Sequence, residues 1–227
     1  TFMSNVSHDL RTPLTSISGN AGNLLTNDEI FDIETRRQIY TDIREDSEWL
    51  ISLVENLLSV SRMGDGKSDI RMSAEVVSDV IDEAVRRTEK NANAHKLTVK
   101  GSNEILLARM DARLIVQVLI NLIDNAIKYT AQGGTVKLTL DADHQHAFIT
   151  VADTGIGIPE DEVNRIFERF YRVDKTRDRE TGGTGLGLSI THATIMMHKG
   201  SIKVNSKEEE GTTILVRIPL KQQSITQ

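Results

Sequence analysis

The sequence predicts an α+β protein in which a helical hairpin precedes an α/β sandwich. Two long stretches, within residues 2–26 and 39–60, carry apolar residues at three- and four-residue spacing, which is typical of amphipathic helices. Beyond them, short alternating segments take turns with helical patterns, as they do where helices cover one face of a sheet. We therefore expect two domains, residues 1–66 and 67–227.

The composition excludes several kinds of protein. The 227 residues carry a net charge of −6, which argues against a nucleic-acid-binding surface. Without cysteine the chain has neither disulfides nor thiolate metal sites, and its six histidines form no H-E-x-x-H pattern. No apolar run approaches the roughly 20 residues that span a bilayer. Since Thr1 begins within a helical pattern, we expect the cytoplasmic portion of a longer protein, anchored in a membrane only through missing upstream segments.

The two helical stretches predict a homodimer. A hairpin of two helices has little interior of its own, so its stripes should meet those of a second copy in a dimeric four-helix bundle. The alternative is that both stripes pack on the rest of the chain. The apolar positions are Val6, Leu10, Leu14, Ile17, Ala21 and Leu24 in the first stripe, and Ile39, Ile43, Leu50, Leu53 and Leu57 in the second.

The second domain should alternate between strands and helices. A loop without periodicity lies between residues 153 and 185, and loops of this length are often lids. We expect strands at 70–74, 97–99, 105–107, 136–140, 147–152, 202–205 and 213–218, and helices at 76–93, 111–130 and 186–198.

A candidate nucleophile lies in the first helix. His8, Thr12 and Thr15 share one helical face, so His8 should be accessible to solvent. A neutral imidazole is a competent nucleophile near pH 7, and Asp9 could hold its tautomer and take up the released proton. Pro13 predicts a local bend beside it. The alternative is an ordinary surface histidine.

The helix expected at 111–130 carries a polar stripe on an otherwise apolar surface. Asn121, Asn125 and Lys128 recur at i, i+4 and i+7. Buried polar groups need partners, and two amides with one cation suit a magnesium–phosphate ligand. Mg²⁺ would meet the amide oxygen of Asn125, and that of Asn121 directly or through a water. The alternative is a stripe that faces solvent.

Two glycine clusters follow. The first succeeds a strand, so its carboxylate could accept a hydrogen bond from the exocyclic amine of adenine, while its glycines let the backbone approach a ligand. The second precedes a helix, whose N-terminal amides form an anion site. Neither has the context of a Rossmann or a Walker motif. The clusters are Asp153, Thr154, Gly155, Ile156 and Gly157, and Gly183, Thr184, Gly185, Leu186 and Gly187.

The loop between the clusters is basic and partly aromatic. Its cations could neutralise phosphates, and its aromatic rings could anchor it on apolar surface. The alternative is a solvated loop. The cations are Arg172, Lys175, Arg177 and Arg179, and the rings are those of Phe167, Phe170 and Tyr171.

Taken in order, the segments around His8, 121–125, 153–157 and 183–187 resemble the H, N, G1 and G2 boxes of bacterial sensor histidine kinases. The resemblance covers nearly the whole chain and implies a GHKL (Bergerat) ATP-binding domain, shared with type II topoisomerases, a heat-shock chaperone and mismatch-repair ATPases. The nucleotide residues it implies are Asn121, Asn125, Lys128, Tyr129, Asp153, Gly155, Gly157, Ile158, Arg172, Lys175, Gly183, Thr184, Gly185, Leu186, Gly187, Leu188 and Thr213.

The same resemblance implies an activity. ATP and Mg²⁺ would serve phosphorylation of His8, followed by transfer to an aspartate of a response regulator, and Thr12 would position water for the reverse dephosphorylation. Hydrolytic members of the fold carry a glutamate base where this chain has Asn121, which favours transfer to a side chain. The alternatives are a degenerate ATP-binding scaffold that dimerises and a hydrolytic ATPase of the same fold.

Within the family, different segments of the chain resemble two different subfamilies. Residues 14–25, 49–61 and 111–130 are most similar to KdpD, the potassium and turgor sensor kinases of Gram-positive bacteria. The lid, residues 167–189, is closer to the phosphate- and cell-wall-sensor type.

Overall fold

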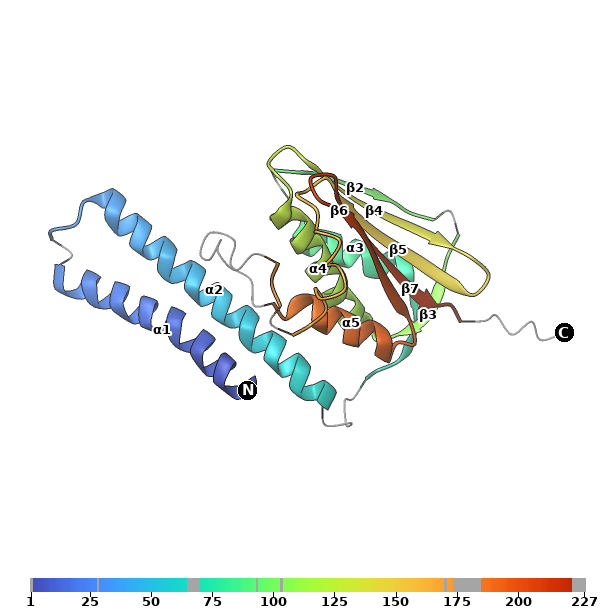
Figure 1. The fold of residues 1–227 in the computed structure, drawn as a ribbon, viewed down its shortest axis with the longest axis horizontal. Helices are drawn as coiled ribbons and strands as arrows, with labels where there is room; N and C mark the ends of the chain where they lie inside the picture. The colour runs from blue at the N-terminus through green and yellow to red at the C-terminus, as the bar shows by residue number, and fades with distance from the viewer. Residues whose placement is uncertain are drawn as a thin grey trace. The chain divides into compact units, whose positions relative to one another are not determined.

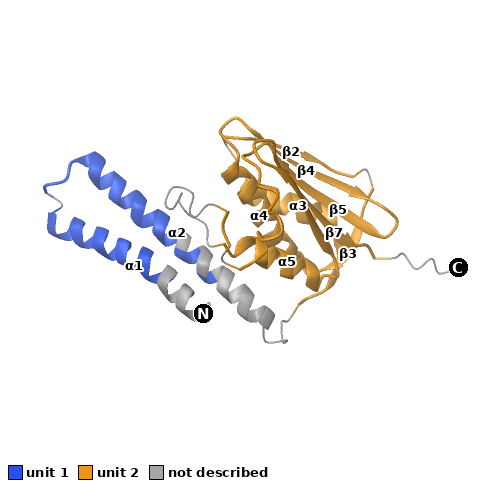
Figure 2. Ribbon diagram, in the orientation of Figure 1, with its two compact units in different colours: residues 1–66 blue, residues 67–227 orange. Residues whose placement is uncertain are grey.

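The chain folds into two compact units, residues 1–66 and 67–227 (Figure 2). Within these units, the computed structural model describes residues 2–27, 29–64, 70–92, 94–102, 104–169, 171–173 and 185–221, and of residues 2–9, 48–49, 52–53 and 55–64 the backbone alone. None of the helices in this described part has the length and apolar character of a membrane-crossing segment.

Two helices form the first unit. Helices α1 (Phe2–Asn27) and α2 (Ile33–Gly64) pack against each other as a hairpin (Figure 1). Asp32 starts α2, because its carboxylate accepts a hydrogen bond from the Thr35 amide at 2.7 Å. This bond also lowers the pKa of Asp32. Both helices predicted from the apolar stripes are thereby confirmed, and α1 continues through Pro13.

The hairpin covers only part of its own apolar surface. Leu10, Pro13 and Ile17 are buried or half-buried. Leu14, however, is 54% exposed and Ile51 is 59% exposed. One partner helix covers a narrower strip than the neighbours in a four-helix bundle do, so a lone hairpin leaves the flanking apolar positions in solvent.

A five-stranded sheet frames the second unit. Its first two strands pair in parallel, and all other neighbours are antiparallel. A separate antiparallel pair joins the remaining two strands. The sheet order is β2 (Lys96–Lys100), β4 (Thr135–Ala142), β5 (His146–Asp153), β7 (Gly211–Pro219) and β6 (Ser201–Lys207), and the separate pair is β1 (Ser73–Val76) with β3 (Leu107–Met110).

Three helices, α3 (Val77–Thr88), α4 (Ala112–Tyr129) and α5 (Gly187–Met197), cover one face of this sheet (Figure 1). Helix α4 lies at the centre, since it contacts α3, α5, β4 and β5. Burying a large aliphatic side chain stabilises the fold by about 1.5–3 kcal/mol. Helix α4 supplies more buried aliphatic side chains than any other helix in the described residues. Its buried residues are Ile115, Val116, Val118, Leu119, Leu122, Ile123, Ala126 and Ile127.

The structure corrects several predicted boundaries. The first strand lies at Ser73–Val76 rather than 70–74, because it pairs with β3 from Ser73 opposite Met110. Strand β3 itself starts at Leu107 rather than 105. The helix expected to reach residue 93 ends at Thr88, where turns begin. Strand pairing and chain reversal depend on partners distant in sequence, which local periodicity does not register.

Asp111 ties three segments of the second unit together. Its side chain, 2% exposed, caps α4 by accepting from the Arg113 amide at 3.2 Å, and it accepts from the Arg71 amide at 3.0 Å. Its own amide donates to Nε2 of the buried His198, just after α5, at 3.0 Å. Burial raises the pKa of Asp111, but the hydrogen bonds and charge of Arg113 and the Arg71 amide outweigh burial and leave that pKa lowered.

We predict that Asp111→Ala lowers the free energy of unfolding by about 2 kcal/mol, since it removes the helix cap and strands the Arg71 amide. Urea denaturation measures this. Because the pKa of Asp111 is lowered, its contribution is present at neutral pH and is lost as the pH falls through the folded pKa, below 3.8. The exposed Asp82 of α3 is the control, and its alanine variant should differ from the parent by less than about 0.5 kcal/mol. Equal effects of the two variants would contradict the assignment.

Candidate nucleotide site

The polar stripe of α4 is half-buried. Asn121, Asn125 and Lys128 all lie between the buried and exposed classes, beside the apolar face that enters the core. The Asn121 oxygen accepts from Nε2 of Gln117 at 3.3 Å, whereas its Nδ2 is buried and has no hydrogen-bond partner among the described residues. A buried donor without a partner indicates a place where a ligand supplies one.

The first glycine cluster closes onto the end of α4. The amide of Ile156 donates to the carbonyl of Tyr129 at 3.1 Å. A Cβ on Gly155 would lie 2.4 Å from that same carbonyl oxygen, so this close approach requires glycine. The loop after β5 is therefore fixed to the helix that carries the polar stripe. The sequence attributed the glycine to the approach of a ligand, but here the approaching group is protein backbone.

Gly157 is explained in the same way. It has a φ of +70°, and a Cβ there would lie 2.0 Å from the Lys207 carbonyl oxygen in the turn between β6 and β7. Two further bonds hold the loop on this turn. Glu209 donates its amide to the Ile156 carbonyl at 2.7 Å, and the Ile158 amide donates to Oγ of Ser206 at 2.8 Å. Both glycines of the cluster thus serve loop packing.

Asp153 ends β5 with one oxygen occupied. Its Oδ1 accepts from the amides of Gly155 at 2.8 Å and Thr212 at 3.1 Å. Burial raises the pKa of Asp153, and these two hydrogen bonds oppose the rise. Oδ2 receives no hydrogen bond from the residues that the structure describes, which leaves an acceptor for a donor such as an adenine amine.

Thr212, rather than the predicted Thr213, belongs to this site. Side chains alternate along β7, and Ile214, Val216 and Ile218 point into the core. Thr213 therefore points to the opposite face of the sheet. Thr212 instead donates its amide to Asp153, and its hydroxyl lies 2.9 Å from that of Ser206. The sequence carried one usable signal, namely that Thr212 directly follows a glycine, Gly211. In the structure, this glycine has a φ of +106°.

The end of the second glycine cluster meets the α4 stripe. A Cβ on Gly187, the first residue of α5, would lie 4.0 Å from Cγ of Asn121. Gly185 has a φ of +65°, and Leu186 is fully buried, so Leu186 anchors the turn in apolar surroundings. Leu188 packs against the core. In the described part of the chain, the residue before α5, Leu186, makes no side-chain capping bond, and the first amides of a helix without such a cap suit an anion.

Two cations lie near each other at the end of α4. Burial and, to a smaller extent, the charge of Arg172 together lower the pKa of Lys128 to about 8. The Lys128 ammonium also lies 5.1 Å from the ring centroid of Tyr129. Two cations this close repel each other in the absence of an anion, and a phosphate group would relieve the repulsion.

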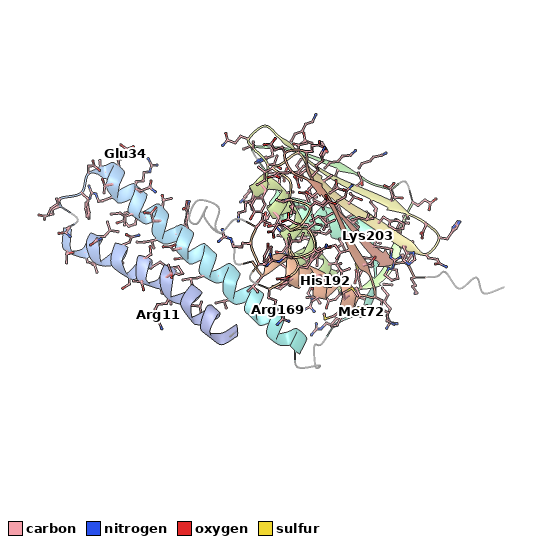
Figure 3. The ribbon with its side chains drawn as sticks, viewed as in Figure 1. Arg11, Glu34, Met72, Arg169, His192 and Lys203 are labelled. Carbon is pink, nitrogen blue, oxygen red and sulfur yellow. The ribbon has the colours of Figure 1, made fainter. Side chains whose placement is uncertain are left out.

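Aromatic contacts hold the start of the lid. Phe167 lies 5.3 Å, centroid to centroid, from His192, which Figure 3 labels on α5. The Arg165 guanidinium lies 4.1 Å from the ring centroid of Tyr171. Phe167 thus contacts a helix outside the loop, whereas Tyr171 packs on a cation of the same loop rather than on apolar surface.

Several predicted site residues lie outside what the structure describes. They are Phe170, Lys175, Arg177, Arg179, Gly183 and Thr184, together with the side chains of His8 and Asp9. The backbone of His8 and Asp9 is helical, and Thr12, one turn further along α1, is exposed. The described site therefore consists of the α4 stripe, the 153–158 loop, the start of α5 and Arg172.

The residues present fit a magnesium–nucleotide complex. Among the described residues, no group of three or more His, Asp or Glu side chains could hold a metal ion. A Mg²⁺ ion here would therefore depend on the amides of Asn121 and Asn125 and on phosphate oxygens, as it does in many nucleotide sites. The unpartnered amide nitrogen of Asn121 supports such a ligand, because rotating the amide turns an oxygen toward the same space.

Two family models match the chain. Residues 110–222 match the histidine kinase-, DNA gyrase B- and HSP90-like ATPase family, and residues 1–66 match the His kinase A (phospho-acceptor) domain. The sensor protein KdpD of Clostridium acetobutylicum is 36% identical over 96% of this chain and 24% of its own length. The sensor histidine kinase WalK of Bacillus subtilis is 38% identical over 98% of this chain and 37% of its own length.

Solved structures share the fold. The histidine kinase AdeS of Acinetobacter baumannii is 25% identical with a TM-score of 0.73, over 94% of this chain and 98% of that one. The histidine kinase ThkA, solved in complex with the response regulator protein TrrA, is 24% identical with a TM-score of 0.76, over 98% of this chain and 62% of that one.

The α4 stripe and its two loops thus define an ATPase-like domain, preceded by a phospho-acceptor hairpin. The chain belongs to the sensor histidine kinases. It spans about a quarter to a third of the length of the curated relatives named above. Because KdpD and WalK match at similar identity, the KdpD-like assignment stays a prediction.

We predict that Asp153→Asn weakens ATP binding by about ten- to a hundredfold and reduces selectivity for adenine over guanine. The asparagine oxygen can keep the two loop hydrogen bonds, so the variant removes only the charge and the second acceptor. Titration calorimetry with ATP and GTP measures both effects. The exposed Asp161 is the control, and Asp161→Asn should leave affinity unchanged. Parental affinity and selectivity in Asp153→Asn would refute the role.

We also predict that ATP binding takes up protons near pH 8. A phosphate beside Lys128 raises its pKa from about 8, so affinity falls as the pH rises through that value. Calorimetry in buffers of different ionisation enthalpy should give up to about half a proton per ATP at that pH. Lys128→Arg should abolish the uptake, since guanidinium stays charged. Uptake that persists in Lys128→Arg would place the titrating group elsewhere.

Proposed function

We propose that the chain is the catalytic portion of an ATP-dependent protein-histidine kinase, which phosphorylates its own His8 and passes the phosphoryl group to an aspartate of a response regulator. One observation carries the proposal. The α4 stripe, the 153–158 loop and the start of α5 converge in one unit, while a second unit carries a histidine segment on its first helix.

Asn121 supports transfer to a side chain over transfer to water. Hydrolytic members of the fold are similar except that a glutamate base stands at this position. A carboxamide has no accessible pKa near neutrality and cannot take a proton from water. The chain itself then offers His8 as the acceptor.

The acceptor step follows from imidazole chemistry. The free ring nitrogen of His8 attacks the γ-phosphorus in line, the new N–P bond forms, the bond to the β–γ bridging oxygen breaks, and ADP leaves. Asp9 would hold the proton-bearing nitrogen and accept its proton as the phosphohistidine becomes neutral. Thr12 would position water for the reverse dephosphorylation of the regulator.

The second unit would position the nucleotide. Asp153 would accept from the adenine amine through Oδ2, and the first amides of α5 would donate to phosphate oxygens. Lys128 and Arg172 would offset the charge that develops on the phosphates. The lid cation Lys175 and the glycine-rich residues Gly183 and Thr184 would complete the phosphate contacts.

A bound Mg²⁺ would neutralise phosphate oxygens and align the γ-phosphoryl group. Asn125 would hold it through its amide oxygen, and Asn121 directly or through a water. Both amides lie on the half-buried stripe of α4, one turn apart, so one helix fixes their spacing.

The hairpin supports a homodimer. Exposed apolar side chains line α1 and α2, and a second copy of the hairpin would cover them in a four-helix bundle. They include Leu14, Leu25, Tyr40, Ile51 and Val54, which are 45–88% exposed.

Two measurements separate this proposal from its alternatives. Incubation with γ-labelled ATP should leave on the protein a label that acid removes and alkali does not, as expected of phosphohistidine. A scaffold would retain no label, and a hydrolytic ATPase would release phosphate without labelling itself.

We predict that His8→Gln abolishes this labelling and leaves ATP affinity nearly unchanged, because His8 lies on a different helix from every proposed nucleotide contact. The exposed His144, in the turn between β4 and β5, provides the matched control, and His144→Gln should label normally. A large loss of ATP affinity in His8→Gln would argue against separate acceptor and nucleotide sites.

We predict further that residues 1–227 sediment as a dimer and residues 67–227 as a monomer that still binds ATP. All proposed nucleotide residues and the sheet core lie beyond residue 66. Analytical ultracentrifugation decides the oligomeric state. If residues 1–227 are monomeric, the hairpin does not form a dimer. If residues 67–227 remain dimeric, the interface lies on the second unit.

A further inference from the structure

The outer face of the five-stranded sheet is unusually basic. The helices cover one face, toward which Val136 and Leu138 of β4 point. Because side chains alternate along a strand, Lys137 and Thr139 point to the other face. The same alternation and the strand register identify the other charged residues that share this outer face.

Six cations and one acid lie on it. Every one of the six is exposed, and they come from four of the five strands. The acid is Asp141, at the end of β4. The cations are Lys96, Lys100, Lys137, Lys203 (labelled in Figure 3), Lys207 and Arg217.

The cations are spread around a neutral centre. Thr150 of the central strand pairs with Thr139 on one side and Leu215 on the other, and all three are half-buried. Lys203 lies opposite Leu215 on the edge strand. Lys137 and Lys203 are therefore three strand spacings apart, about 14 Å across the sheet, and are offset by two residues along the strands.

This distribution contrasts with the rest of the chain. The whole sequence has 33 acidic and 27 basic residues, so a face with six cations and one acid leaves the remainder strongly negative. Among the described residues, Lys207 forms an ion pair with Glu210. An anionic surface would therefore attract this face and repel the others, which fixes the orientation of approach.

We propose that the outer face of the five-stranded sheet binds reversibly to the surface of an anionic lipid bilayer. Charge complementarity supplies the attraction. The spread of the cations and their exposure favour a bilayer over an acidic protein, because specific acidic ligands are usually held by fixed, partly desolvated charges. The proposal is independent of the acceptor histidine.

Co-sedimentation of residues 1–227 with vesicles tests it. Binding should occur to vesicles of phosphatidylglycerol and phosphatidylcholine and not to phosphatidylcholine alone. It should be lost when salt rises from about 0.1 M to about 1 M, which shortens the screening length from about 10 Å to about 3 Å. Each cation near the surface contributes about fivefold to partitioning, so Lys137→Glu with Lys203→Glu should reduce binding at least about 25-fold.

The matched control reverses two exposed cations that follow α3 and α5, Lys90→Glu with Lys199→Glu, and should retain binding. Both double variants should keep ATP affinity, which shows that they fold. The proposal is overturned if the parent does not distinguish the two vesicle types, if the Lys137 and Lys203 variant binds as the parent does, or if both double variants lose binding equally. Binding to an acidic protein in place of vesicles would also overturn it.

Discussion

The burial of α4 against the sheet is the constraint on which the rest of the second unit depends. Eight of its side chains enter the core, and this fixes the direction of the adjoining polar stripe. Two contacts then close the site around it: the Tyr129 carbonyl, at the end of α4, accepts a hydrogen bond from the 153–157 loop, and Gly187 lies near the side chain of Asn121 in the middle of the helix. Asp111, which caps the start of the same helix, connects α4 to the end of α5 through its hydrogen bond to His198. The helix that is needed for stability thus also sets the positions of the polar side chains in the proposed nucleotide site.

Much of this arrangement could be predicted from local pattern. Periodicity located α4 to within a residue at each end, since Asp111 and Thr130 are its caps, and it placed Asn121, Asn125 and Lys128 on one stripe. Periodicity does not show which strands pair, so the predicted bounds of β1 and β3 were wrong by two or three residues. The choice of Thr213 over Thr212 failed for a related reason: which face a strand residue occupies depends on the register of the whole sheet.

The glycines show how a correct motif can carry an incomplete explanation. Gly155 and Gly157 lie at the predicted site, yet the groups that exclude a Cβ are the carbonyl oxygens of Tyr129 and Lys207. The loop is shaped by packing against α4 and the β6–β7 turn, and Asp153 is aimed by the amides of Gly155 and Thr212. Oδ2 of Asp153 is thereby left as the acceptor that we propose for the adenine amine. Long-range contacts of this kind have no trace in a local sequence window.

The central claim is that one helix stripe and two loops form a single ATP site. A crystal structure of residues 1–227 with Mg²⁺ and a non-hydrolysable ATP analogue tests it most directly. The account predicts the adenine amine within hydrogen-bond distance of Asp153 Oδ2, the metal at the Asn125 amide oxygen, and the phosphates at the first turn of α5. An adenine ring bound elsewhere, or a metal without contact to the α4 stripe, would contradict it.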